Sequence, residues 1–132
     1  MAVGVITCVP LVCPVAAAAA TRAGSTAKDE VGAHNGRCSL REAIEAVQSP
    51  GARTGCGRVS QGSNTIVLGS GRYVLSIPPR REDDNSSGDL NLDGAASVTI
   101  TSAGVRATVI DARGLGDRSL SVASGARLVL SR

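Results

Sequence analysis

The stretch Cys38-Ser39-Leu40-Arg41-Glu42-Ala43-Ile44 joins a cysteine, a helix start and an apolar helix face within a few residues. Ser39 and Glu42 form a capping-box pattern, in which the serine hydroxyl accepts from one backbone amide and the glutamate from another. Apolar residues then recur at helical spacing. A helix of roughly ten residues is unstable alone in water, so it must pack on an apolar surface. The sequence therefore predicts a short amphipathic helix whose defining residues are Ser39, Leu40, Glu42, Ile44 and Val47.

The composition excludes one class of partner. The chain has 132 residues, 14 basic and 11 acidic side chains, and one Tyr with no Phe or Trp. Both signs of charge are interleaved, with no basic block and no aromatic platform. We therefore expect no nucleic-acid partner.

The segment 1–20 contains no charged side chain and ends in the alanine run 16–20. This pattern is typical of a secretory signal peptide, cut after Ala18 or Ala20. Pro10 and Pro14 in so short a run argue against a membrane span. We expect a secreted or cell-surface protein without a membrane span in the mature chain.

Export leaves two cysteines in the mature chain. Cys8 and Cys13 depart with the signal, and Cys38 and Cys56 remain. Two cysteines in an oxidising compartment most simply form one disulfide, which would tie the helix start to the loop after it. A metal pair or a reactive thiol is the alternative, although two cysteines and His34 are too few for a closed zinc site. We expect His34 itself to be a solvated loop residue.

After residue 59 the chain consists of short β-branched and aliphatic runs separated by glycine and polar turns. The runs recur at a constant step along the sequence. The number of residues from Ile66 to Leu90 is equal to the number from Val74 to Val98. A constant step of this size predicts a β-solenoid, whose turns stack on one another. A β-sandwich is the rival, because short strands and frequent turns fit it too.

The motif and the runs after it resemble the CSLREA domain of secreted bacterial proteins. Cys38 to Ala46 matches the motif that names the domain, and the runs 64–68 and 71–75 are similar to the family's first turn. The acidic loop that begins with Glu82-Asp83-Asp84-Asn85, followed by Gly88-Asp89-Leu90, is similar to the family's acidic loop and the strand after it. The runs 98–100 and 107–111 are similar to its second turn. The resemblance covers about residues 31 to 130.

The resemblance implies the N-terminal portion of a right-handed parallel β-helix, mainly β, capped by one short amphipathic α-helix. We expect the chain to be truncated, since it stops directly after a strand with no closing cap. The implied role is non-enzymatic: a secreted or cell-surface structural or adhesion-type protein with an unidentified extracellular ligand. The expected segments are a signal peptide at 1–20, a linker at 21–36, the capping helix and disulfide loop at 37–58, and the first two to three β-helix turns at 59–132.

One stretch partly matches a calcium loop. Asp89, Asn91 and Asp93 occupy its first three ligand positions, but Ile100 stands where the bidentate glutamate belongs. The alternative is a strand with Leu90 inward and the three polar residues on the solvent face. We prefer the strand, and we expect no cofactor or metal, with calcium as the weak candidate.

An enzyme is the second functional hypothesis, as the front part of a polysaccharide-active lyase or hydrolase. That chemistry needs carboxylates converging on one groove. The candidates are Asp83, Asp84, Asp89, Asp93 and Asp111, with Arg80 or Arg81 as base or clamp. A shared fold alone does not make an enzyme, and Tyr73 is the single aromatic residue for sugar stacking. We therefore expect no catalytic residues here; a gene remnant without function is the third alternative.

Overall fold

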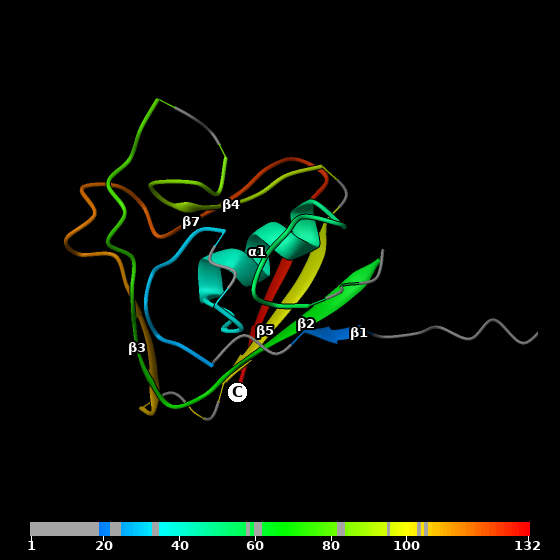
Figure 1. Cartoon of the computed structure of the whole chain (residues 1–132), viewed down its shortest axis with the longest axis horizontal. Helices are drawn as coiled ribbons and strands as arrows, with labels where there is room; N and C mark the ends of the chain where they lie inside the picture. Colours follow the sequence, from blue (N-terminus) through cyan, green and yellow to red (C-terminus); the bar gives the residue numbers. More distant parts are fainter. Residues whose placement is uncertain are drawn as a thin grey trace, which may run out of the picture.

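The computed structural model describes residues 19–21, 25–32, 35–57, 59, 62–81, 84–94, 96–102, 104 and 106–132. Within this part the chain is rich in strands and has one short helix (Figure 1). Most of the predicted signal peptide, and His34, lie outside the described residues. In chain order the elements are β1 (Ala19–Thr21), α1 (Leu40–Gln48), β2 (Ser63–Leu68), β3 (Gly71–Val74), β4 (Leu90–Leu92), β5 (Ser97–Ser102), β6 (Thr108–Asp111), β7 (Leu120–Val122) and β8 (Arg127–Ser131).

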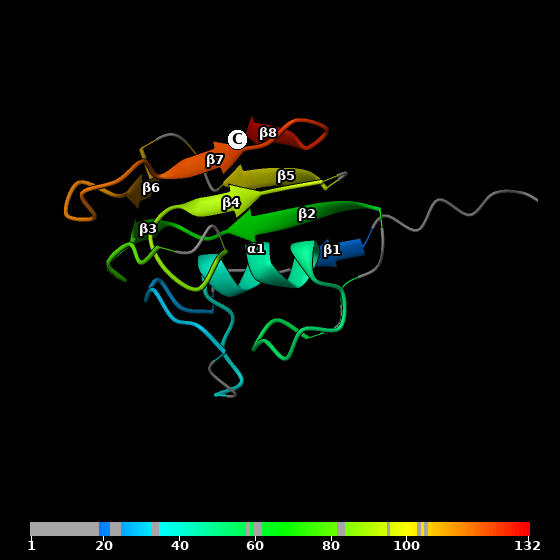
Figure 2. The ribbon, with the colours of Figure 1, turned by 90° about the horizontal axis from the view of Figure 1, so that it is seen from above.

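The strands form three parallel sheets. One sheet has the order β1-β2-β5-β8, and the pairs β3-β6 and β4-β7 form the other two. Successive strands β2, β3 and β4 belong to different sheets, and β5, β6 and β7 then pair with them in the same order. Figure 2 shows these strands in layers, with α1 at one end beside β1 and β2. The parallel pairing does not fit a β-sandwich, whose sheets are antiparallel.

The constant step predicted between strands is wrong. Ile66 pairs with Ile100 instead of Leu90, and Leu90 pairs with Leu120. The predicted step matched strands of different sheets, because Leu90 belongs to β4 and Ile66 to β2. The true spacing varies, since the loops that join the three sheets differ in length. The runs 64–68, 71–75, 98–100 and 107–111 are confirmed as strands to within a residue or two at each end.

The core lies between α1 and the first layer of strands. Leu40, Ala43 and Ile44 are buried on the inner face of the helix, as the helical spacing predicts. They pack with the inward residues of β2 and β4, and α1 contacts both strands. The buried apolar cluster comprises Cys38, Leu40, Ala43, Ile44, Val47, Ile66, Leu68, Tyr73, Leu75, Leu90, Leu92, Val98, Ile100 and Leu115.

Candidate functional site

The start of α1 has the predicted capping box. The Ser39 hydroxyl accepts from the Glu42 amide at 3.1 Å, and the Glu42 carboxylate accepts from the Ser39 amide at 3.0 Å. The same Ser39 hydroxyl donates to the backbone carbonyl of Glu30 at 3.0 Å. Ser39 and Glu42 are both buried. The cap therefore fixes the helix start and also the segment that precedes it.

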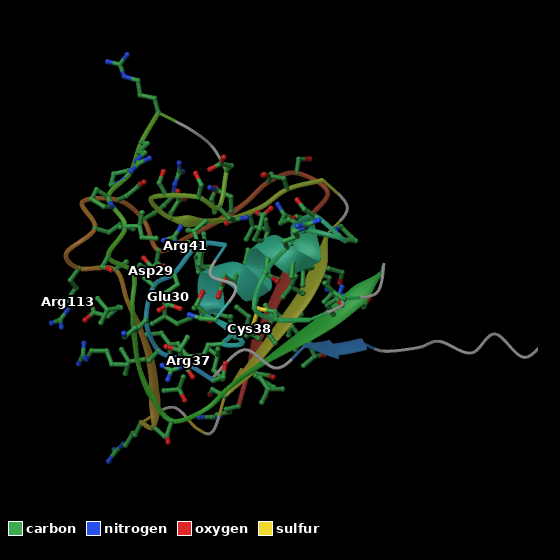
Figure 3. All side chains as sticks on the ribbon, viewed as in Figure 1. Asp29, Glu30, Arg37, Cys38, Arg41 and Arg113 are labelled. Atoms are coloured by element: carbon green, nitrogen blue, oxygen red, sulfur yellow. A yellow bond between two sulfur atoms is a disulfide. The ribbon has the colours of Figure 1, made fainter. Side chains whose placement is uncertain are left out.

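Arg41 is the centre of a buried polar network. Its side chain is fully buried, and Nε lies 2.6 Å from Oδ1 of Asp29, whose side chain is 1% exposed. A second guanidinium nitrogen donates to the other Asp29 oxygen at 3.1 Å, so the pair is bidentate. Figure 3 labels both side chains at the N-terminal end of α1. A bidentate arginine–carboxylate pair fixes geometry as well as charge.

The remaining donors of Arg41 hold the acidic loop. The guanidinium donates to the carbonyl of Gly88 at 2.7 Å, and at longer range to those of Asn85 and Asp89 at 3.4 and 3.5 Å. Three carbonyl oxygens therefore converge on one cation. The sequence prediction left Arg41 without a role, although a charged residue between Leu40 and Ile44 was a signal for a buried partner.

Asp29 lies in the segment predicted as a linker. Besides the bonds from Arg41, its carboxylate accepts hydrogen bonds from a second part of the chain. Its Oδ2 accepts from the backbone amides of Ser76 at 2.7 Å and Ile77 at 3.0 Å, directly after β3. One carboxylate therefore binds the helix, through Arg41, and the chain that leaves β3. Nothing in the local sequence around Asp29 marks this role.

Asn85 closes the edge of β4. Its side-chain amide donates to the Asn91 carbonyl at 3.0 Å and accepts from the Asn91 amide at 2.7 Å. These are the two backbone groups that a neighbouring strand would otherwise pair. Asn85 is itself 3% exposed. An asparagine side chain therefore takes the place of a strand at this end of the sheet.

Cys38 and Cys56 form the predicted disulfide, with Cα atoms 4.5 Å apart. The loop between them is also held by the Gly55 amide, which donates to the Glu42 carboxylate at 3.4 Å. On the other side, the Cys38 amide donates to the Ser25 hydroxyl at 2.6 Å. The helix start is thus joined covalently to the loop after it and by hydrogen bonds to the segment before it.

The weak calcium candidates do not share a solvent face. Asp89 and Asn91 are 6% and 8% exposed, whereas Asp93 is exposed, so the prediction of three solvated residues is wrong for the first two. Arg118 Nε lies 2.8 Å from Asp89, and Asp93 accepts from the Gln48 amide at 3.5 Å. In the described part of the chain, no group of three or more His, Cys, Asp or Glu side chains is placed to hold a metal ion.

The remaining carboxylates considered for catalysis lie in separate surroundings. Asp111 binds Arg113 and Arg72, and the hydrogen bonds from Arg113 chiefly hold its pKa well below the usual range. Hydrogen bonds from the Ser86 hydroxyl and amide lower the pKa of Asp84. Asp83 lies outside the described residues, and Arg80 and Arg81 are exposed.

A small cavity lies beside the Arg41 network. Its volume is about 220 Å³, and it is bounded by Val31, Thr54 and Asn85 from three chain segments, with Arg41 and Glu42 at its helix side. It marks the point where the N-terminal segment, the disulfide loop and the acidic loop meet.

No family model, curated protein or solved structure matches the chain. Among the helices of the described residues, none is long and apolar enough to cross a membrane. The described residues form a strand-rich fold of parallel sheets, with one short helix that starts next to the Cys38–Cys56 disulfide.

Proposed function

We propose that this chain is the N-terminal cap and first turns of a right-handed parallel β-helix of the CSLREA kind. Its role is structural: it closes one end of the stack in a secreted or cell-surface, non-enzymatic protein. The observation that carries the proposal is the set of contacts that the motif residues make. Cys38 and Glu42 both bind the loop after the helix, Ser39 binds the segment before it, and Arg41 binds the acidic loop, so the motif joins three chain segments at the helix start.

The solenoid part of the proposal is supported by how the inward residues align. Ile66, Ile100 and Leu130 occupy matching positions of three consecutive strands in one sheet. Tyr73 pairs with Ile110, and Leu90 with Leu120, in the other two sheets. The chain passes through three sheets in turn and then returns to the first. The inward side chains of successive turns therefore stack in a column.

The two ends of the column differ. At the end covered by α1, Ile66 and Leu90 are fully buried. At the far end, Leu130 is 63% exposed, whereas Ile100 in the strand before it is 3% exposed. Within the described residues, one end is therefore closed by the motif, and the other presents uncovered apolar side chains and the outer edge of β8.

A structural role is supported by the way the candidate carboxylates are engaged. Asp89 pairs with Arg118, and Asp111 pairs with Arg72 and Arg113. These contacts tie neighbouring strands and turns together. The exposed residues Arg80, Arg81 and Asp84 form the surface that we propose to face an extracellular ligand.

Export and oxidation of the whole chain test the localisation. The chain with segment 1–20 included is produced in a bacterial host, and the exported fraction is mapped by non-reducing peptide mass spectrometry. A Cys38–Cys56 peptide in that fraction is expected. A chain retained in the cytoplasm, or exported with two free thiols, overturns the secreted, disulfide-linked cap.

The solenoid is tested by amide contacts in solution. Nuclear Overhauser contacts are expected between the strand around Ile66 and the strand around Ile100, and between those around Leu90 and Leu120. Contacts between the Ile66 and Leu90 strands as direct neighbours would contradict it. A variant with both Cys38→Ser and Cys56→Ser is the control, because it keeps the strand sequences and removes only the covalent link.

A further inference from the structure

The backbone of Ala19–Thr21 pairs with β2. As strand β1 it runs parallel to β2, with Ala19 opposite Asn64, Ala20 opposite Thr65 and Thr21 opposite Ile66. The sheet order places β1 on the edge opposite β8, at the end where α1 lies (Figure 2). Ala19 and Ala20, from the predicted signal region, therefore belong to the folded sheet.

This pairing completes the closure of the covered end. The Asp29 carboxylate accepts from the two backbone amides that follow β3. The Asn85 side chain forms hydrogen bonds with the backbone at the edge of β4. The outer edge of β2 pairs with the backbone of β1. An unpaired edge strand invites another chain, and β1 and Asn85 remove that hazard at β2 and β4.

The alanine run leaves the cleavage point open by sequence alone. Small residues at the first and third positions before the cut suit hydrolysis after Ala18 and equally after Ala20. The two cuts differ in what they leave. Cleavage after Ala18 keeps the whole of β1, whereas cleavage after Ala20 leaves Thr21 alone and removes the two residues that pair with Asn64 and Thr65.

We infer that the signal peptide is cut between Ala18 and Ala19, so that the mature chain begins with β1. The inference rests on the export proposed above. A host signal peptidase hydrolyses the Ala18–Ala19 peptide bond with one water molecule. Ala18 leaves as the carboxylate end of the signal peptide, and Ala19 becomes the ammonium end of the edge strand.

N-terminal sequencing and intact mass of the exported protein test the cleavage point. The precursor is produced in an exporting bacterial host, and the secreted or periplasmic chain is isolated without tags at its N-terminus. A chain beginning at Ala19 is expected. An exported chain beginning at Thr21 or later overturns this inference and leaves the export intact, whereas an uncleaved cytoplasmic precursor overturns both.

The protective role of β1 is tested on two purified chains. One begins at Ala19 and the other at Arg22, both released from a cleavable fusion and oxidised. The shorter chain is expected to self-associate at several-fold lower concentration in sedimentation velocity, because its β2 edge is open. Equal self-association of the two chains overturns the role given to β1.

Discussion

Arg41 shows how one buried residue can organise a protein end. Its guanidinium is paired with Asp29 and surrounded by carbonyl oxygens from the acidic loop. A buried ion pair is weak evidence for net stability, because both charges lose their hydration. Breaking such a pair is nevertheless costly, since it leaves one buried charge without its partner.

The first prediction concerns this pair. Arg41→Ala and Asp29→Asn are each expected to lower the free energy of unfolding by about 3–5 kcal/mol, the range for breaking a buried pair. The double variant is expected to lose less than the sum of the two, since it leaves no unpaired charge. Urea denaturation of the oxidised chain measures all three. Arg41→Lys keeps the charge but not the bidentate geometry, and remains folded enough to measure if Arg41→Ala does not.

A strictly additive double variant, or single losses within about 0.5 kcal/mol as at ordinary surface positions, would contradict the network.

The roles of Asp29 and Asn85 could not be predicted from the sequence. Asp29 lies 12 residues before Arg41, and Asn85 lies 44 residues after it. Neither separation has a local signature, whereas the capping box uses only neighbouring residues.

The second prediction concerns Asp111 at the surface. Hydrogen bonds from Arg113, and from Arg72, keep its pKa low, so the folded state favours the ionised carboxylate. That contribution is complete above the unfolded carboxyl pKa of about 3.9 and is lost as the pH falls through the lower folded value. Asp111→Asn should therefore lower Tm at pH 7, and the gap from the original chain should close in strong acid. A gap that is constant with pH would contradict this assignment.

At the scale of elements, local signals predicted most of the secondary structure. The capping box predicted α1, and alternating β-branched runs predicted the strands from β2 to β8. The pairing of those strands was predicted incorrectly, because the spacing depends on loops of unequal length between sheets. Asp89 and Asn91 were predicted on a solvent face and are buried, since contacts with Asn85 and Arg118 cover that side.

The third prediction concerns the covalent link between α1 and its following loop. The disulfide closes a sequence separation of 18 residues, which corresponds to about 3 kcal/mol in the chain-entropy model. The double variant with Cys38→Ser and Cys56→Ser is expected to lose roughly that free energy of unfolding. The loop keeps the hydrogen bond from Gly55 to Glu42, so the strands should retain their far-ultraviolet circular dichroism. Loss of the strand signal at low temperature would show that the link is needed for folding itself.

At the scale of the whole molecule, the two ends of the described strand stack differ in how well their backbone groups and apolar side chains are covered. At the end beneath α1, β1 pairs with the edge of β2, Asn85 pairs with the edge of β4, and Asp29 accepts from the amides that follow β3. At the other end of the described chain β8 has a partner on one side only, and its inward-facing Leu130 is largely exposed. This asymmetry predicts that the isolated chain associates through the β8 end, where apolar surface and strand edge coincide.

The fourth prediction tests that asymmetry with one charge. Leu130→Lys places an ammonium group among the uncovered side chains of the edge strand, which disfavours pairing with another chain. The variant is expected to raise several-fold the concentration at which the oxidised chain self-associates in sedimentation velocity. Val67→Lys is the matched control, because Val67 is 39% exposed on β2, which has strands on both sides. Because both side chains are exposed in the original chain, Tm should change little in either variant. Equal effects of the two lysines on association would mean that charge, and not the open edge, controls it.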